Sequence, residues 1–234
     1  MKKINCFLAL VLFLTMQAQE IQLHYDPRNV FHPGVADKNY LTATFQMFKP
    51  DKWGSTFGFV DVDFNSDKGN IGLAYLEVYR NIKIGNSPIM PHVEYNGGIV
   101  LGDNNSGFSI PNAYLIGASY VKAFEKGSME TYVTYKYNSF DKASHDVQWT
   151  LIWLFKLWDD RITITGFTDV WTENKDRTGV KKAKKVILLT EPQFWYNVNK
   201  NLAFGSEIEI SNNFYANYNS RLYVFPTIAG KWTF

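Results

Sequence analysis

The chain has 234 residues, of which 46% are hydrophobic, 17% aromatic and 20% charged, and its formal net charge is +2. The length suits a single β domain. The composition excludes a disordered chain, and the near-neutral charge argues against a nucleic-acid-binding surface.

The N-terminal segment has the pattern of a secretory signal. Lys2 and Lys3 precede an apolar stretch from Cys6 to Leu14, and Ala18 supplies a small residue at the cleavage position. This pattern predicts a signal peptide over residues 1–18 and export from the cytoplasm. The mature chain, 19–234, then has a net charge near zero and no cysteine for disulfides or thiolate metal sites.

Alternation of apolar and polar residues predicts about twelve strands. Turn-forming clusters separate them, and the polar stretches 172–184 and 211–220 are predicted as longer loops. In chain order the strands are expected near 21–25, 41–48, 56–64, 72–79, 92–100, 112–122, 129–137, 147–157, 162–171, 185–196, 203–211 and 222–234. For 112–122, 185–196 and 222–234 the inward face is left open, because a slip of one residue exchanges the two faces.

The polarity of the faces distinguishes a soluble sandwich or barrel from a membrane barrel. No apolar run after residue 18 is long enough for a transmembrane helix, so a spanning chain must close its strands into a barrel. Two features favour apolar side chains that point outward into lipid. The chain ends on a strand with a terminal aromatic, Phe234. Aromatic residues also recur near strand ends, as expected for interfacial girdles, at Tyr40, Phe48, Trp53, Trp158, Trp195, Tyr196 and Trp232.

The sequence thus predicts an all-β fold, a transmembrane antiparallel β-barrel of about 12 strands in the outer membrane of a Gram-negative bacterium, in contact with its lipids.

Three blocks resemble a known family. They are Asn39-Tyr40-Leu41 with Phe45, Phe48, Asp51, Trp53, Phe57-Gly58-Phe59-Val60-Asp61 and Phe64; then Ile164-Thr165-Gly166-Phe167-Thr168-Asp169-Val170-Trp171; and the closing Gly230-Lys231-Trp232-Thr233-Phe234. In this order they are similar to strands of the nucleoside-specific outer-membrane channels, the Tsx-like porins. The resemblance implies twelve strands, an outer-membrane location, nucleoside transport, and a terminal Phe234 that the barrel-assembly machinery reads.

The polar faces, turned inward, would form a narrow acidic and aromatic lumen. The candidate ligand-binding residues are Phe59, Asp61, Asp63, Tyr75, Glu77, Tyr79, His92, Glu94, Tyr132, Phe167, Asp169, Trp171, Glu207 and Glu209, with Glu191 and Lys136 nearby. Aromatic faces can stack a base, carboxylates and hydroxyls can bind ribose, and the acidic lining disfavours phosphorylated solutes. We therefore predict facilitated passage of nucleosides or similar small neutral polar solutes.

Asp61 and Asp63 lie on one face of one strand. Their proximity requires either a cation opposite or protonation of a carboxylate.

Two alternatives remain open. Acidic and basic side chains often fill a barrel interior in satisfied networks, which would make the chain a structural or scaffold barrel with a plugged lumen. A lipid hydrolase is the enzyme alternative, but His24, His32, His92 and His145 fall in no recognisable serine-containing signature. We expect no enzyme activity, no cofactor, no metal site and no nucleic-acid partner.

Overall fold

The computed structural model describes residues 19–102, 106–176, 183–215 and 220–234, so the predicted signal peptide, 1–18, lies outside the described residues. The described part holds fourteen strand segments in one antiparallel sheet. They are β1 (Gln19–Asp26), β2 (Tyr40–Asp51), β3 (Gly54–Asp63), β4 (Leu73–Ile82), β5 (Ile89–Leu101), β6 (Gly107–Phe124), β7 (Gly127–Asn138), β8 (Ser144–Leu157), β9 (Ile162–Asn174), β10 (Lys184–Thr190), β11 (Gln193–Asn197), β12 (Leu202–Asn212), β13 (Leu222–Pro226) and β14 (Ile228–Thr233).

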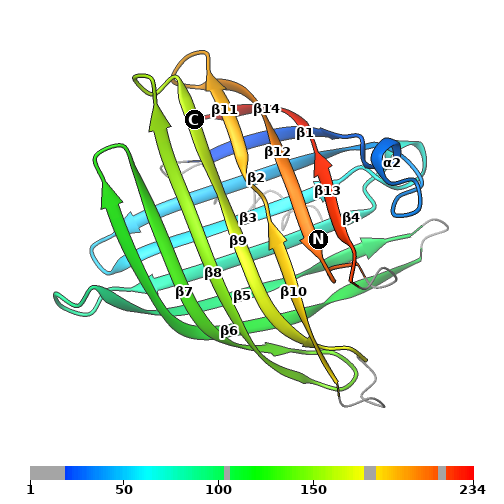
Figure 1. Cartoon of the computed structure of the whole chain (residues 1–234), viewed down its shortest axis with the longest axis horizontal. Helices are drawn as coiled ribbons and strands as arrows, with labels where there is room; N and C mark the ends of the chain where they lie inside the picture. Colours follow the sequence, from blue (N-terminus) through cyan, green and yellow to red (C-terminus); the bar gives the residue numbers. More distant parts are fainter. Residues whose placement is uncertain (1–18, 103–105, 177–182, 216–219) are drawn as a thin grey trace, which may run out of the picture.

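The sheet closes on itself as a barrel. From β1 to β9 each strand pairs with the next along the chain, and β14 pairs with both β12 and β1 (Figure 1). Because β10 with β11 and β13 with β14 each form one interrupted strand, the closed barrel has 12 strands. The predicted fold class and each predicted strand are therefore confirmed.

The first interruption has a clear chemical cause. Pro192 has no N–H to donate, so the strand breaks between β10 and β11. The backbone still bridges the break, because the N–H of Glu191 donates to the carbonyl of Phe167 at 3.0 Å and the carbonyl of Pro192 accepts from Ile208 at 3.0 Å. The wall is thus continuous through the interruption.

The two faces have the predicted polarity. Large apolar side chains such as Val133, Val147 and Trp149 lie exposed on the outer surface, whereas polar side chains are buried inside. The faces that the sequence left open are now assigned. The inward residues include Leu115 and Ser119 of β6, Ile187 of β10, Trp195 of β11, and Tyr223 and Phe225 of β13.

Two members of the predicted aromatic girdles were placed wrongly. Trp195 is only 1% exposed and points inward, where its indole N–H donates to Gln193. Tyr40 also turns inward, and its ring lies under the guanidinium of Arg28 at 5.3 Å. Both residues sit near strand ends, and position along a strand does not determine which face a ring occupies. The other girdle residues, Phe48, Trp53, Trp158, Tyr196 and Trp232, are exposed as expected.

The connections differ between the two rims. Short turns join β2–β3, β4–β5, β6–β7, β8–β9 and β11–β12 at the rim that also holds Gln19 and Phe234. At the other rim most connections are longer, and the one after β1 carries the short helix α2 (Arg28–Phe31). Figure 1 shows α2 at one end of the barrel, opposite the β2–β3 turn.

Some predicted boundaries shift. β2 continues through the predicted turn at Pro50-Asp51, β9 reaches Asn174 and β12 reaches Asn212, so these elements are longer than the sequence indicated. Of the predicted loops, residues 103–105, 177–182 and 216–219 lie outside the described residues. A 3-10 turn, η1 (Asp67–Gly69), follows β3. No helix in the described ranges is long and apolar enough to cross a membrane.

Candidate functional site

The strand alternation places all of the predicted lumen residues on the inner face of the barrel. They are Phe59, Asp61 and Asp63 of β3; Tyr75, Glu77 and Tyr79 of β4; His92 and Glu94 of β5; Tyr132 of β7; Phe167, Asp169 and Trp171 of β9; and Glu207 and Glu209 of β12. Their ligand-binding role stays a prediction. Their environments differ, and the differences divide the interior into a filled part and an accessible part.

One side of the interior is filled by a network near the short-turn rim. Asn81 on β4 donates to Glu130 on β7 at 2.6 Å, and Tyr79 donates to the same carboxylate at 3.2 Å. His92 bonds Asn81 at 2.8 Å and stacks on the ring of Tyr132 with centroids 4.0 Å apart. Since β4 and β7 are separated in the sheet by two strands, these contacts reach over β5 and β6 and fill this side of the interior.

A second filled region lies where β1, β11 and β14 meet. His24 bonds Gln22 at 2.9 Å and Thr227 at 3.1 Å. The ammonium of Lys231 lies 4.4 Å from the ring centroid of Trp195 and forms an ion pair with Glu20 at 3.6 Å. This part of the lumen is therefore occupied by side chains from the wall itself.

Between these regions, acidic residues keep part of their surface accessible. We call the set Asp61, Glu77, Glu94, Asp169, Glu191 and Glu207 the acidic belt; all but the buried Glu94 retain some exposure. Asp61 interacts electrostatically with Glu207 and Glu191 on the far wall. Glu77 and Asp169 interact with each other and with Glu94, and Glu191 interacts with Asp169. The belt thus links β3, β4 and β5 to β9, β12 and the β10–β11 break.

Hydroxyl and amide donors hold several belt carboxylates in place. Thr44 donates to Asp61 at 2.5 Å, Thr150 to Asp169 at 2.5 Å and Gln193 to Glu207 at 2.6 Å. Lys136 attracts two of these carboxylates, Glu77 and Asp169. Its ammonium bonds Gln148 at 2.7 Å and lies 4.6 Å from the ring centroid of Trp171.

Hydroxyl groups are the main hydrogen-bond donors to the Asp61/Asp63 pair. Thr42 donates to Asp63 at 2.7 Å, in the same way that Thr44 serves Asp61. The guanidinium of Arg28 attracts the Asp63 carboxylate from a distance. The sequence allowed for a cation directly opposite this pair. In its place, two threonine hydroxyls donate to the carboxylates and Arg28 attracts Asp63 from farther away.

Arg28 is a central residue that sequence reasoning missed. From α2 it reaches into the barrel mouth, where it pairs with Asp26 at 2.6 Å and Glu209 at 3.2 Å and donates to Tyr215 at 2.8 Å. Its guanidinium also lies 4.7 Å from the ring centroid of Phe225. Burial alone lowers the pKa of Arg28, but the surrounding tyrosine and carboxylate groups raise it above its ordinary value. The side chain therefore stays charged at this mouth.

His32 adds ring contacts at the same mouth. Its ring meets those of Tyr223 and Phe225 edge to face, with centroids 5.1 Å apart in each case. We call Arg28 and His32 with their partners the mouth cluster. Its sequence signal is slight, because an arginine two residues after an inward aspartate does not reveal a contact with β12.

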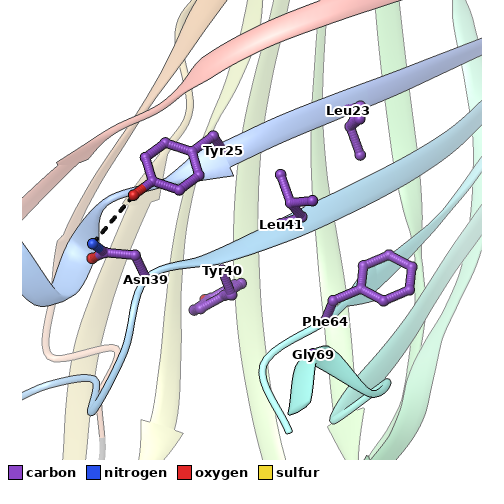
Figure 2. Close-up of a pocket in the computed structure, with 7 residues that line it drawn as sticks. All are labelled: Leu23, Tyr25, Asn39, Tyr40, Leu41, Phe64 and Gly69. Atoms are coloured by element: carbon purple, nitrogen blue, oxygen red, sulfur yellow. Dashed lines mark hydrogen bonds between the residues drawn. The ribbon is translucent and has the colours of Figure 1, made fainter. Parts of the chain in front are cut away.

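A groove of about 450 Å³ lies near this rim but on the barrel wall (Figure 2). It contains none of the predicted lumen residues, and it is bordered by a hydrogen bond in which Asn39 donates to Tyr25 at 3.3 Å. The lining residues are Leu23, Tyr25, Asn39, Tyr40, Leu41, Phe64 and Gly69. Because Leu23, Tyr25 and Leu41 are exposed on the outer surface, the groove is not part of the path through the lumen.

Two of the histidines that the sequence singled out form hydrogen bonds with side chains beside them. His92 bonds Glu94 at 3.1 Å, and His145 on the outer face bonds the hydroxyl of Tyr135 at 2.5 Å. Asp146, next to His145 in the chain, points inward instead and pairs with Lys184 at 2.7 Å. Within the ranges that the structure describes, no group of three His, Cys, Asp or Glu side chains could hold a metal ion.

A closed antiparallel barrel with apolar side chains outside and polar ones inside defines the class of transmembrane β-barrels. The chain belongs to the family described as a domain of unknown function, DUF5020, whose model matches residues 18–234. No curated protein matches the sequence.

Three solved structures are similar to the chain at low sequence identity, and the likeness to the first shows the fold. The NanC porin superimposes with a TM-score of 0.57 at 10% identity, covering 92% of this chain and 98% of that one. The outer membrane channel DcaP of Acinetobacter baumannii gives 0.48 at 10% identity (93% and 95% covered). LpxR from Salmonella typhimurium gives 0.46 at 8% identity (93% and 100% covered). The resemblance to nucleoside-specific channels stays a prediction.

Proposed function

We propose that the chain is exported to the outer membrane and forms a channel there for small polar solutes that carry no negative charge, with nucleosides as the first candidates. The observation that carries this proposal is the acidic belt, whose accessible carboxylates lie beside the aromatic rings of Phe59, Tyr75 and Phe167. The likeness to the NanC porin supports a channel-type fold.

The belt has the chemistry for weak, selective contact. A base that stacks on an aromatic ring gains about 1–3 kcal/mol, and carboxylates accept hydrogen bonds from ribose hydroxyls. The same carboxylates repel phosphate, so a nucleotide should pass less readily than its nucleoside. Because a channel must release its solute, these contacts have to remain individually weak.

The orientation follows from the rims. Short turns and both ends of the barrel chain mark the periplasmic side of such barrels, and longer connections mark the outer side. The mouth cluster then faces the outside and the short-turn network faces the periplasm. On this view the aromatic residues of the short-turn rim, such as Trp53 and Trp158, contact lipid at the inner interface.

Liposome swelling with folded protein tests the proposal. Adenosine should enter faster than into protein-free liposomes, and AMP should enter more slowly than adenosine. The double variant Asp61→Asn, Asp169→Asn should reduce the difference between the entry rates of adenosine and AMP. Uptake of adenosine no faster than in protein-free liposomes, by protein shown to be folded by its gel mobility without heating, would overturn the channel.

The mouth cluster favours a second candidate, a structural barrel whose lumen is closed. Arg28 and His32 occupy one mouth with several contacts. Single-channel recording separates the two functions. If the protein is a channel, the wild type should carry an ionic current. If it is a closed barrel, neither the wild type nor Arg28→Ala should carry a current. For the third candidate, lipid hydrolysis, nothing in the described part of the chain speaks in favour. A lipid A deacylation assay tests it.

A further inference from the structure

Most interior carboxylates outside the acidic belt have a cation within 4 Å. The ion pairs are Glu20–Lys231, Asp26–Arg28, Glu209–Arg28, Asp146–Lys184 and Glu173–Lys185. In the described part of the chain, no belt carboxylate forms an ion pair with a lysine or arginine. Lys136 is the single described ammonium that attracts Glu77 and Asp169, and it is held by Gln148 and Trp171. The belt thus gathers carboxylates that no lysine or arginine of the described chain pairs with directly.

Glu94 supplies an independent sign of a missing partner. Its side chain is 0% exposed, and one carboxylate oxygen bonds His92. The other oxygen, Oε1, is buried and has no hydrogen-bond partner. A buried carboxylate oxygen left unpaired is costly, so the position calls for a donor. Glu94 interacts electrostatically with Glu77 and Asp169, so its unpaired oxygen belongs to a carboxylate of the belt.

Aromatic rings accompany these carboxylates. Phe59 and Tyr75 lie with ring centroids 5.9 Å apart on the wall that carries Asp61 and Glu77, and Phe167 is two residues from Asp169 on the other wall. Carboxylates beside aromatic faces are the combination that binds organic ammonium groups, through charged hydrogen bonds and cation–π attraction. The described carboxylates are not arranged as a metal site.

We propose that the acidic belt binds small solutes that carry an ammonium group, and that the lumen selects cations over anions. The proposal rests on the proposed channel for access to the belt, and it names the class of solute that the belt prefers. An ammonium supplies both the positive charge that the belt lacks and the donors that its carboxylates accept. Several carboxylates share the charge, so the solute can move between them and leave again.

Binding to the purified, folded protein in detergent tests the ligand class without requiring conduction. The probe is 1,4-diaminobutane, and the matched neutral probe is 1,4-butanediol. Calorimetry at low salt should show binding of the diamine and none of the diol, and salt should weaken it. Equal behaviour of the two probes with the wild-type protein would overturn the proposal, and this comparison needs no variant.

Charge removal then locates the site. The double variant Glu191→Gln, Glu207→Gln should bind the diamine about tenfold more weakly, because two charge-assisted contacts are lost. Asp159→Asn removes a carboxylate whose side chain is fully exposed in the β8–β9 turn, and it should bind like the wild type. Equal loss in both variants would place the binding outside the belt.

Reversal potentials in a KCl gradient separate this inference from the proposed function. A conducting protein should prefer potassium over chloride, and Glu191→Gln, Glu207→Gln should reduce that preference. A barrel that binds diamine but conducts nothing would refute the channel and keep the ammonium site. A barrel that passes adenosine yet favours chloride would keep the channel and refute the inference.

Discussion

Arg28 offers the sharpest test of how the interior is held together. In Arg28→Ala, Asp26 loses its ion pair and the hydrogen bond from the arginine Nε, and Glu209 loses its cation. The Asp26 side chain is only 4% exposed, so solvent cannot replace the lost partner. Breaking a buried ion pair from one side costs 3–5 kcal/mol, and the residual exposure of Arg28 argues for the lower end, about 3 kcal/mol.

Arg80 provides a matched control. It pairs with Asp51 at 2.8 Å, but both side chains are substantially exposed at the short-turn rim. Arg80→Ala should therefore cost no more than about 1 kcal/mol. A further variant, Asp26→Asn with Arg28→Met, should recover part of the loss, because it removes the stranded charge together with its partner.

The free energy of unfolding can be measured by urea titration of the barrel in lipid vesicles, with tryptophan fluorescence as the readout. Arg28→Ala should have a clearly lower free energy of unfolding than Arg80→Ala. Equal losses in the two variants would show that Arg28 does not form a buried cluster at the mouth, and a loss below about 1 kcal/mol for Arg28→Ala would show the same.

Three further predictions concern the wall and its assembly. Gly205→Ala should lower the free energy of unfolding by about 1–3 kcal/mol, because the added Cβ would lie 2.1 Å from a carbonyl oxygen of β11. In the control Gly230→Ala, the added Cβ meets only a ring at 3.8 Å, so this variant should fold normally. Urea titration compares the two variants. Val133→Arg, in the middle of β7 on the outer face, should lower the free energy of unfolding in vesicles by about 2–4 kcal/mol. Val198→Arg, at the rim, should lower it by about 0–1 kcal/mol. Equal losses in the two variants would argue against a lipid-facing outer wall. Deletion of Phe234, which is 68% exposed, should lower the outer-membrane level of the protein in cell fractions but leave refolding in vitro intact; unchanged levels would remove the assembly machinery as its reader.

The strands and their two faces were predictable because β alternation is a local property. Val147, Trp149 and Leu151 share a face by spacing alone, and Asp61 and Asp63 share the opposite kind of face for the same reason. Bilayer chemistry then decides which face points outward. The even strand count and the inward position of all the candidate lumen residues followed from these two facts.

Closure of the barrel decided the rest. The pairing of β14 with β1, the contact of Arg28 with Glu209 and the reach of Asn81 to Glu130 join residues far apart in the chain. No local pattern encodes such contacts, because they depend on barrel width and on the path of the loop after β1. Pro192 interrupts the strand predicted over 185–196, and only the folded wall shows that Glu191 there completes a belt with Asp61 and Glu207.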